Sequence, residues 1–481
     1  MYSSDAASLR TDDSMRPLVI DLDGTLIYSD LLWEALLLFL KQHFWQAWRL
    51  PFWLLGGKAA FKERLANAVQ FDPASLPYDQ HLIKEIEAQR ALGRKIVLAT
   101  GSQRRLAEQI AAHLGLFDLV AATGEGVNLT GKHKAAHLNG LYGEGNFDYV
   151  GNSRVDIPVW NACRGAYSVT HKPFRLADGR DTTQLGGQRE GAARHLLKGM
   201  RPRQWLKNML VFVPMLTGHA FGIATLTQSL VAFVAFSLCA SSAYLLNDAL
   251  DAGDDRRHPT KRKRPIAAGK LPLPLALMTS PLLAIAAITL CAIFDPLLLL
   301  TLCIYFVTTV CYSLYLKRLL MIDIVTLSLL YTLRILGGSA ATHIAPSFWL
   351  LAFSFFIFLS LALLKRYSEL FNLHKQGKEK TSGRGYTTAD KIPVGTMGVA
   401  CAFLSVLIFM LYFNSEAVLQ MYARPYLLLG IVPLLVLWLG RLWLLAYRGL
   451  VNEDPVLYVS KDKASLLVIG MCAAIACAAS F

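Results

Sequence analysis

The sequence predicts two folds in one chain: an N-terminal α/β domain of Rossmann-like type and a C-terminal all-α membrane bundle of nine transmembrane helices. The 481 residues are 54% hydrophobic and only 17% charged, whereas a soluble domain has about 25% charged residues. The apolar residues concentrate in 206–481, in runs of roughly 20 residues, which is the length of a membrane-spanning helix. Short β-branched runs occupy 16–174 instead. This distribution excludes a disordered chain and a single soluble domain, and eight cysteines without a CxxC pair argue against a disulfide scaffold or a zinc site.

The N-terminal third has the pattern of a parallel sheet covered by helices. Residues 1–15 are polar, and we expect them to be loose. Between 16 and 174, apolar β-branched runs alternate with helical stretches. The expected strands are 17–21, 95–100, 119–122, 148–151 and 167–170. Residues 175–193 lack apolar periodicity and are expected to form a linker to the membrane domain, 194–481.

The distribution of Lys and Arg agrees with nine membrane spans. Seven of these residues lie in 252–272 and seven in 365–391, whereas Arg424 is alone among the connections on the other side. Because cytoplasmic loops are enriched in Lys and Arg, we expect a multi-pass protein of the inner (cell) membrane whose N-terminal domain is cytoplasmic. The expected spans are 206–222, 224–246, 273–293, 296–316, 320–342, 347–364, 393–413, 425–446 and 464–481.

The first expected strand ends in two carboxylates, Asp21 and Asp23, within Asp-Leu-Asp-Gly-Thr. Both point into the crevice at the carboxyl end of the sheet. Such a pair suits phosphoryl transfer, because one carboxylate can attack phosphorus while the other protonates the leaving oxygen. This motif resembles that of the haloacid dehalogenase superfamily of phosphatases, over about 150 residues.

The resemblance implies a fold with a helical cap (about 30–92), a Mg²⁺ ion and a set of site residues. Asp21 would be the nucleophile and Asp23 the acid/base, and both would also contact the metal. Thr100 and Lys134 would bind phosphate, with Lys132 as a fallback, and Asn152 and Asp156 would complete the metal site. Asn152 stands where the family usually has Asp, so the alternatives are reduced activity and a folded but inactive domain.

The cap region contains an unusually apolar segment, LLWEALLLFLKQHFWQAWRLPFWLLGG, with four of the nine tryptophans. Tryptophans beside cations are typical of a segment at the membrane interface. The alternative is a cap that packs on its own domain or on the membrane domain. The sequence leaves both open.

A second acidic motif follows the second expected span, in Asn247–Asp255. Spacings of three and four place Asp248, Asp251 and Asp255 on one helical face, where oxygen ligands suit Mg²⁺. The motif resembles NDxxDxxxD of the UbiA superfamily of intramembrane prenyltransferases. That resemblance implies nine helices and a diphosphate bound through Mg²⁺, with Asn247 as a further ligand.

Within that superfamily, 195–481 resembles the decaprenyl-phosphate phosphoribosyltransferase branch. RPRQWLKNMLVFVP, HPTKRKRPIAAG, YSLYLKRLLMID, LRILGG and LKRYSEL carry the likeness. Ordinary prenyltransferases have a second aspartate cluster between spans six and seven, where this chain has mainly cations. Cations suit two anionic substrates, because such substrates repel each other strongly in a low-dielectric site. A charged residue within a membrane span, such as Arg334, costs free energy and is usually functional. The candidate substrate-binding residues are Arg201, Lys207, Asn208, Lys261, Arg264, Lys317, Asp323, Arg334, Lys365, Arg366 and Tyr367.

These resemblances imply a bifunctional, Mg²⁺-dependent membrane enzyme. The membrane domain would transfer 5-phosphoribosyl from phosphoribosyl diphosphate to a polyprenyl phosphate, and the N-terminal domain would hydrolyse the ribose 5-phosphate. Three alternatives are prenylation of an aromatic acceptor beside a separate phosphatase, an inactive regulatory phosphatase domain, and a transporter, which the acidic motif at a membrane edge disfavours. No nucleic-acid partner is expected, and homo-oligomerisation is left open.

Overall fold

The computed structural model describes two compact units, each with its own core. The first contains Met1–Met200 with Tyr244–Ser280, and the second Arg201–Ala243 with Pro281–Phe481. The expected loose segment 1–15 lies outside the described residues. The structure describes residues 16–124, 128–170, 173–185, 191–258, 260–377, 379, 384–413, 418, 421–451 and 454–480.

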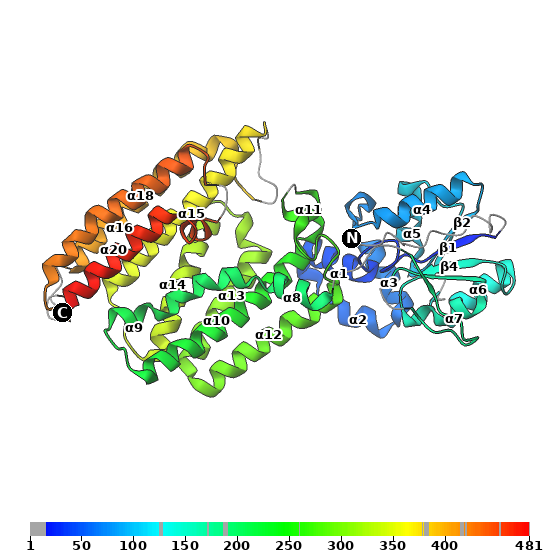
Figure 1. The fold of residues 1–481 in the computed structure, drawn as a ribbon, viewed down its shortest axis with the longest axis horizontal. Helices are drawn as coiled ribbons and strands as arrows, with labels where there is room; N and C mark the ends of the chain where they lie inside the picture. The colour runs from blue at the N-terminus through cyan, green and yellow to red at the C-terminus, as the bar shows by residue number, and fades with distance from the viewer. Residues whose placement is uncertain are drawn as a thin grey trace, which may run out of the picture. The chain divides into compact units, whose positions relative to one another are not determined.

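A six-stranded parallel sheet forms the centre of the first unit (Figure 1), with strand order β3-β2-β1-β4-β5-β6. The predicted parallel α/β sheet is therefore confirmed. Strand β1 lies between β2 and β4, and the strand order runs outward from it in both directions. The loop after β1 therefore lies at the crevice where such sheets usually bind their ligands. The strands are β1 (Leu18–Ile20), β2 (Ile96–Gln103), β3 (Leu119–Thr123), β4 (Asp148–Gly151), β5 (Gly165–Ser168) and β6 (Thr183–Gln184).

Helices cover both faces of this sheet, because its strands carry buried side chains on both sides. Leu18 and Ile20 belong to one apolar core, and Val19 belongs to the other. The first core is closed by α1 (Leu31–Gln42), α3 (Lys58–Ala68), α4 (Gln80–Ala91) and α5 (Arg104–Leu114). The second is closed by α6 (Lys132–Tyr142) and α7 (Ile157–Ala162). The short α2 (Arg49–Leu55) connects α1 to α3.

The segment expected to be a linker, 175–193, is partly structured. Thr183–Gln184 pairs with β5 as the edge strand β6, and Leu176 and Leu185 are buried against the sheet. Buried leucines and backbone hydrogen bonds hold 175–185 to the first domain. Helix α8 (Ala192–Met200) then begins before the expected linker ends.

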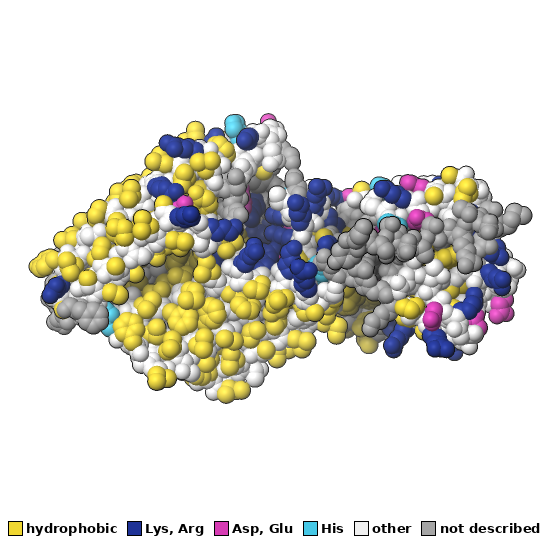
Figure 2. Space-filling view, in the orientation of Figure 1, with side chains coloured by type: hydrophobic (Ala, Val, Ile, Leu, Met, Phe, Trp, Pro, Cys, Tyr) yellow, Lys and Arg dark blue, Asp and Glu magenta, His cyan; other side chains and the backbone are white. Residues whose placement is uncertain are grey.

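Eight helices among the described residues are long and apolar enough to cross a membrane, so the chain is a multi-pass membrane protein. Hydrophobic side chains cover much of the surface of this bundle (Figure 2), as expected for helices that face lipid. The eighth expected span, 425–446, begins with the 3₁₀ segment η9 (Pro425–Gly430). The helices are α10 (Ile223–Leu250), α12 (Leu273–Phe294), α13 (Pro296–Leu314), α14 (Ile322–Thr342), α15 (Phe348–Lys375), α16 (Lys391–Phe413), α18 (Ile431–Tyr447) and α20 (Lys463–Ser480).

The first expected span, 206–222, is not confirmed as a continuous helix. The 3₁₀ segment η5 (Pro202–Phe212) runs into the five-residue helix α9 (Val213–Thr217). Pro214 cannot donate a backbone hydrogen bond, which favours a break at this position. At Gly338 of α14, a Cβ atom would lie 1.9 Å from the Val211 carbonyl oxygen. The glycine therefore lets η5 approach the membrane helix backbone to backbone.

Candidate active sites

The loop after β1 places Asp21 at the centre of a buried polar cluster. Lys134, from α6, donates hydrogen bonds to Asp21 Oδ1 at 2.7 Å and to the Tyr149 hydroxyl at 2.9 Å. The Tyr149 hydroxyl donates in turn to Asp156 Oδ1 at 2.8 Å. Thr25 Oγ1 donates to Asp21 Oδ2 at 3.1 Å. One carboxylate oxygen of Asp21 thus contacts an ammonium group and the other a hydroxyl, which fixes the orientation of its side chain.

Asp23 lies beside this cluster and is held by a different set of donors. The Ser102 hydroxyl donates to Asp23 Oδ2 at 2.6 Å, and the Leu31 backbone N–H donates to Oδ1 at 2.8 Å. Thr100 Oγ1 is 3.4 Å from Asp23 Oδ2. The structure therefore brings together Asp21, Asp23, Thr100 and Lys134, the four predicted catalytic residues.

Asn152 and Asp156 lie at the loop after β4. Asp156 Oδ2 accepts from the backbone N–H groups of Asn152 and Ser153, both at 3.1 Å. A Cβ atom on Gly24 would lie 2.0 Å from Asn152 Nδ2, so the amide packs directly on the Asp-Leu-Asp-Gly turn. Asn152 is therefore close to the acidic pair, as expected of a residue in the same site.

Burial raises the pKa of both acids of the pair. Desolvation raises the pKa of Asp21 to about 7 even though Lys134 opposes the shift, and Asp156 raises it further. Desolvation, helped by the charge of Asp30, raises the pKa of Asp23 to about 6. Clustered buried carboxylates with a single lysine are destabilised in their charged forms. A divalent cation would relieve that repulsion, although no three acidic, His or Cys side chains of the described residues are arranged to hold one here, so the Mg²⁺ ion stays a prediction.

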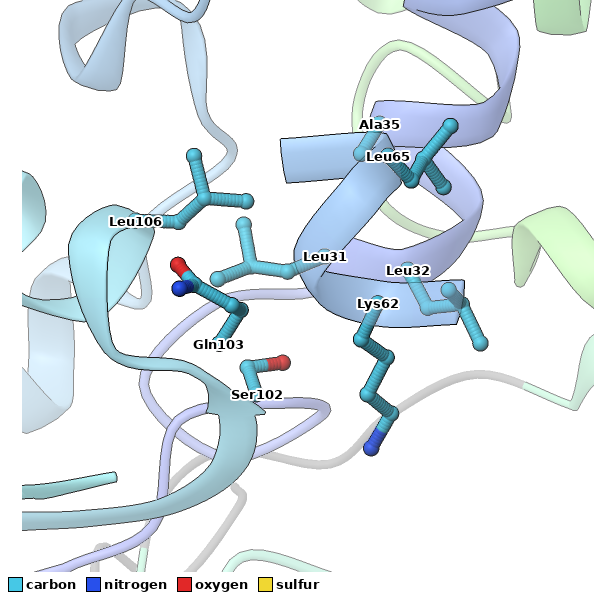
Figure 3. Close-up of a pocket in the computed structure, with 8 residues that line it drawn as sticks. All are labelled: Leu31, Leu32, Ala35, Lys62, Leu65, Ser102, Gln103 and Leu106. Carbon is cyan, nitrogen blue, oxygen red and sulfur yellow. The ribbon is translucent and has the colours of Figure 1, made fainter. Parts of the chain in front are cut away.

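A pocket opens next to Asp23, between the sheet and the cap helices. Figure 3 shows Ser102, Gln103 and Leu106 on one side and residues of α1 and α3 on the other. Among the described residues, Lys62 is the only charged one in the lining. Its ammonium group donates to the Gly101 carbonyl at 2.6 Å and to Asn128 Oδ1 at 3.2 Å. The remaining lining residues are the apolar Leu31, Leu32, Ala35 and Leu65.

The second acidic motif lies in the same compact unit, at the end of α10 and in α11 (Ala252–Arg257). Arg264 donates to Asp248 Oδ1 at 3.1 Å and to Asp255 Oδ2 at 2.6 Å, which joins two of the predicted metal ligands. Burial raises the pKa of Asp255 although Arg264 opposes the shift. Asp251 Oδ1 is 4.0 Å from the Lys41 ammonium group.

The other two predicted residues of this segment are less buried. Asn247 precedes Asp248 on α10 and accepts a backbone hydrogen bond from Asp251 at 2.9 Å. Lys261 begins the 3₁₀ turn η6 (Lys261–Lys263), and its charge acts on Asp255. Arg264 thus joins Asp248 and Asp255, but among the described residues no three acidic, His or Cys side chains are arranged to hold a metal ion, so the Mg²⁺ site at this motif stays a prediction.

In the second unit, two predicted lysines converge on an aspartate that sequence reasoning missed. Lys207 donates to Asp454 Oδ2 at 2.7 Å, and Lys365 donates to the same oxygen at 3.3 Å. Burial alone would raise the pKa of Asp454, but the two lysines lower it well below its ordinary value. Lys207 also lies over the ring of Tyr331, at 5.5 Å. A buried lysine, Lys207, and a partly exposed one, Lys365, thus share one carboxylate.

Arg334 is buried within α14, at 4% exposure. Its guanidinium donates to Asn208 Oδ1 at 2.7 Å, to the Tyr305 hydroxyl at 2.8 Å and to the Leu330 carbonyl at 2.5 Å. Asn208 Nδ2 in turn donates to Ser237 Oγ at 2.9 Å. None of these partners carries a negative charge, so the positive charge of Arg334 stays unneutralised by its hydrogen-bond partners.

A third group surrounds Asp323, which is fully buried at the start of α14. It accepts hydrogen bonds from Arg366 and, at 2.7 Å, from the Tyr386 hydroxyl. Arg366 also pairs with Glu369. Predicted residue Tyr367 is not in this group: its ring lies 4.7 Å from that of Tyr447, within an apolar core.

Two predicted cations lie at segment ends. Arg201 is the residue before η5 and has a left-handed backbone, with φ of 55°. Lys317 lies in the 3₁₀ turn η7 (Leu316–Arg318) and is half-buried. Their grouping with the lysine pair on Asp454 stays a prediction.

Sequence reasoning missed several residues that complete these clusters. Tyr149, Ser102 and Asp454 were not among the predicted site residues. Asp454 caps α19 (Pro455–Val459), since its side chain accepts from the Val456 N–H at 3.2 Å. The second role of Asp454 is to pair with the two lysines. The available signal for it in the sequence was an acidic residue close to a connection rich in basic residues.

These features define a membrane-embedded helical domain with buried cations, combined with an α/β domain whose acidic site is of phosphatase type. The family model described as UbiA prenyltransferase family matches residues 209–459, and that described as haloacid dehalogenase-like hydrolase matches residues 18–160. The chain belongs to the UbiA prenyltransferase family and carries a haloacid dehalogenase-like domain at its N-terminus.

Three relatives illustrate how far the similarity extends. A protein of Sinorhizobium fredii, y4nM, whose function is uncharacterized, is 34% identical over 95% of this chain and 89% of its own length. The nodulation protein NoeC of Azorhizobium caulinodans is 35% identical over 56% of this chain and 88% of its own length. The decaprenyl-phosphate phosphoribosyltransferase of Mycolicibacterium smegmatis is 38% identical over 40% of this chain and 63% of its own length.

Proposed function

We propose that the chain is a bifunctional membrane enzyme. The membrane domain transfers 5-phosphoribosyl from phosphoribosyl diphosphate to a polyprenyl phosphate, and the N-terminal domain then hydrolyses the ribose 5-phosphate. The enzyme is proposed to lie in the inner membrane with the N-terminal domain in the cytoplasm, where phosphorylated metabolites are found. Nine membrane passages, with 206–222 as the first, remain part of this proposal.

One observation carries the first half of the proposal: Arg334 is buried within a membrane helix, and its hydrogen-bond partners among the described residues are all uncharged. Lys207 and Lys365 share Asp454, and Arg334 has only uncharged partners. A positive charge inside a membrane domain is costly unless a substrate or partner neutralises it. Two anionic substrates supply that neutralisation, whereas a neutral aromatic acceptor does not. The name of the mycobacterial relative agrees with this substrate class.

The residues that would hold Mg²⁺ for this reaction are Asp248, Asp251 and Asp255, with Asn247. When bound, the ion neutralises the diphosphate leaving group. The basic side chains orient the two substrates, so that an oxygen of the lipid phosphate forms the new bond to C1 of the ribose while the bond from C1 to diphosphate breaks. No protein nucleophile is required, because positioning and charge stabilisation suffice for such a displacement.

The second half of the proposal rests on the Asp21 cluster. A carboxylate oxygen of Asp21 attacks phosphorus, and the bond from phosphorus to the ribose oxygen breaks. Asp23, whose pKa is raised to about 6, is partly protonated near neutrality and donates its proton to that oxygen. Asp23 then takes a proton from the water that hydrolyses the phosphorylated Asp21. Lys134 and Thr100 bind the phosphate oxygens, and Mg²⁺ held by Asp21, Asp23, Asn152 and Asp156 neutralises phosphate charge when it is bound.

The transfer is tested by incubating proteoliposomes with ribose-labelled phosphoribosyl diphosphate, polyprenyl phosphate and Mg²⁺. Label should enter the lipid fraction with the wild type and not with Asp251→Ala. Asp178→Ala, which removes an exposed acid outside both acidic motifs, is the control and should keep most of the activity. Absence of labelled lipid with the wild type, together with prenylation of an added aromatic acceptor from a prenyl diphosphate, would replace this proposal with the alternative.

The hydrolysis is tested with the same proteoliposomes by following the 5-phosphate. Asp21→Asn should accumulate the lipid-linked ribose 5-phosphate, whereas the wild type should release inorganic phosphate from it. If wild type and Asp21→Asn accumulate the same phosphorylated lipid, the N-terminal domain does not act on this product. That outcome would leave the transfer itself intact and favour an inactive or regulatory domain.

A further inference from the structure

The cap of the first unit presents an aromatic surface on its outside. In the 3₁₀ segment η2 (Phe44–Gln46) and in and just before α2, Trp45, Trp48, Phe52 and Leu55 are 87%, 63%, 62% and 85% exposed. We call these four residues the tryptophan patch. The rings of Trp48 and Phe52 are 6.1 Å apart, which makes the exposed surface continuous over one turn. Single exposed apolar side chains are ordinary, but clustered exposed aromatics indicate an interaction surface.

The exposure of this patch does not result from an unpacked segment. Trp53, on the other side of α2, packs its ring 5.1 Å from that of Phe39, and Leu50 packs against the same core. Helix α2 therefore has an inner face that anchors it to the domain and an outer face that bears the patch. The sequence left open whether the tryptophans pack inward or contact a membrane, and the structure packs Trp53 on its own domain but leaves Trp45 and Trp48 exposed.

Charge around the patch favours an anionic partner. The sequence contains no Asp or Glu between Glu34 and Glu63. Arg49 and Lys58 lie in that interval, whereas Lys41 is already paired with Asp254. The guanidinium of Arg49 lies over the ring of Trp48, 5.6 Å from its centroid, and donates to Gln46 Oε1 at 3.0 Å. Aromatic rings next to cations suit the headgroup region of a bilayer, where rings reach the acyl boundary and cations meet lipid phosphates.

We propose that the tryptophan patch inserts into the headgroup region of the bilayer in which the apolar helices of this chain are embedded. The covalent link to those helices keeps the domain near the membrane, so a patch of modest intrinsic affinity is sufficient. Helices α1 and α3, which flank α2, also line the pocket beside Asp23. Docking through α2 would thus hold that pocket close to substrates anchored in the membrane.

Tryptophan quenching by brominated lipid tests this proposal without any dependence on enzyme activity. The full chain is placed in nanodiscs that hold one copy each, with phosphatidylcholine and phosphatidylglycerol, with or without brominated acyl chains. The chain has nine tryptophans, so the wild type is compared with Trp45→Phe/Trp48→Phe. If the patch contacts lipid, the quenched fraction of the emission falls in the variant. If the patch is in water, the variant removes only unquenched emission, the quenched fraction rises, and the proposal is overturned.

Amide hydrogen exchange in 44–55 supplies an independent measurement. Exchange should slow at least tenfold when the discs contain phosphatidylglycerol, and Trp45→Glu/Trp48→Glu should abolish that protection. Leu92→Glu/Leu141→Glu adds the same charge at two separate exposed leucines, 52% and 48% exposed, and should leave it unchanged. Protection that requires two copies in each disc would mean that a second copy covers the patch, which contradicts the proposal.

Discussion

Arg256 and Glu34 form a buried, two-pronged ion pair. The guanidinium donates to the two carboxylate oxygens of Glu34 at 2.5 and 3.2 Å, and the side chains are 9% and 8% exposed. Arg256 directly follows Asp255, an acid of the second motif, and Glu34 lies in the first turn of α1. The pair therefore ties the acidic segment of the transferase family to the cap of the phosphatase-like domain.

Helix α1 contacts an acid of each motif. At its start, the Leu31 N–H donates to Asp23, and at its end Lys41 pairs with Asp254 at 2.5 Å. Glu34 lies between these two contacts and also accepts from the Ser29 hydroxyl at 2.5 Å. A displacement of α1 would therefore disturb both the phosphatase acid and the segment that carries Asp251 and Asp255.

We predict that Glu34→Ala destabilises the first unit and lowers transferase activity. Removing one partner of a buried ion pair leaves an uncompensated charge, which costs about 3 to 5 kcal/mol. Thermal unfolding in detergent measures the loss, and the lipid-labelling assay measures activity. Arg257→Ala is the control, because Arg257 pairs with Asp72 at the surface, with side chains 60% and 48% exposed. An exposed pair contributes less than about 1 kcal/mol. Equal effects of the two substitutions would refute a special role for the buried pair.

The pKa of Asp21 predicts how stability depends on pH when magnesium is chelated. Burial raises this pKa to about 7 from an ordinary value of 3.8, so the folded chain holds a proton that the unfolded chain has lost. Stability therefore falls as pH rises between about 4 and 7, by on the order of 3 kcal/mol, and changes little above that window. Denaturant unfolding in EDTA at pH 5 and pH 8 measures the difference.

Asp21→Asn is the variant that isolates this group. An amide does not titrate, so the variant should lose most of the difference in unfolding free energy between pH 5 and pH 8 and be more stable than the wild type at pH 8. In the wild type, Mg²⁺ should reduce the difference in unfolding free energy between pH 5 and pH 8, because a bound cation favours the carboxylate form of Asp21. A pH dependence that is identical in wild type and variant would show that another group dominates.

The parts of the fold and site that the sequence predicted are those that local patterns encode. Apolar runs indicated the sheet and the membrane helices, and the short acidic motifs indicated Asp21 and Asp248 as site residues. The partners of these groups depend on distant contacts instead: Lys207 and Asp454 are 247 residues apart in sequence. The broken segment η5 was missed for a similar reason. Hydropathy registers its apolar residues but not the close packing of its backbone on Gly338.

Arg334 provides a test of the cationic lining. Arg334→Lys keeps the charge but cannot reach Asn208, Tyr305 and the Leu330 carbonyl together, because an ammonium group is a compact donor without the guanidinium fork. We expect about a hundredfold loss of transfer in Arg334→Lys and a larger loss in Arg334→Met. Initial rates with varied phosphoribosyl diphosphate and varied lipid phosphate identify which substrate is affected. Arg318→Gln, at an exposed turn residue, is the control and should retain activity, and wild-type rates for Arg334→Met would exclude Arg334 from the site.

In our interpretation, Asn152 sets the metal affinity of the phosphatase-like domain. We therefore predict that Asn152→Asp raises the affinity of this domain for Mg²⁺. The side chain packs on the Gly24 turn beside Asp21, and an added carboxylate there would give a divalent cation a charged ligand instead of a neutral one. We expect the Mg²⁺ concentration for half-maximal phosphatase activity to fall about tenfold, with the maximal rate equal or higher. A titration of phosphate release against Mg²⁺ measures both quantities. Asn128→Asp, which places the same charge beside Lys62 rather than beside the acidic pair, is the matched control. An unchanged or weaker Mg²⁺ requirement in Asn152→Asp would exclude this position from the metal site and favour a domain that works without the usual acid.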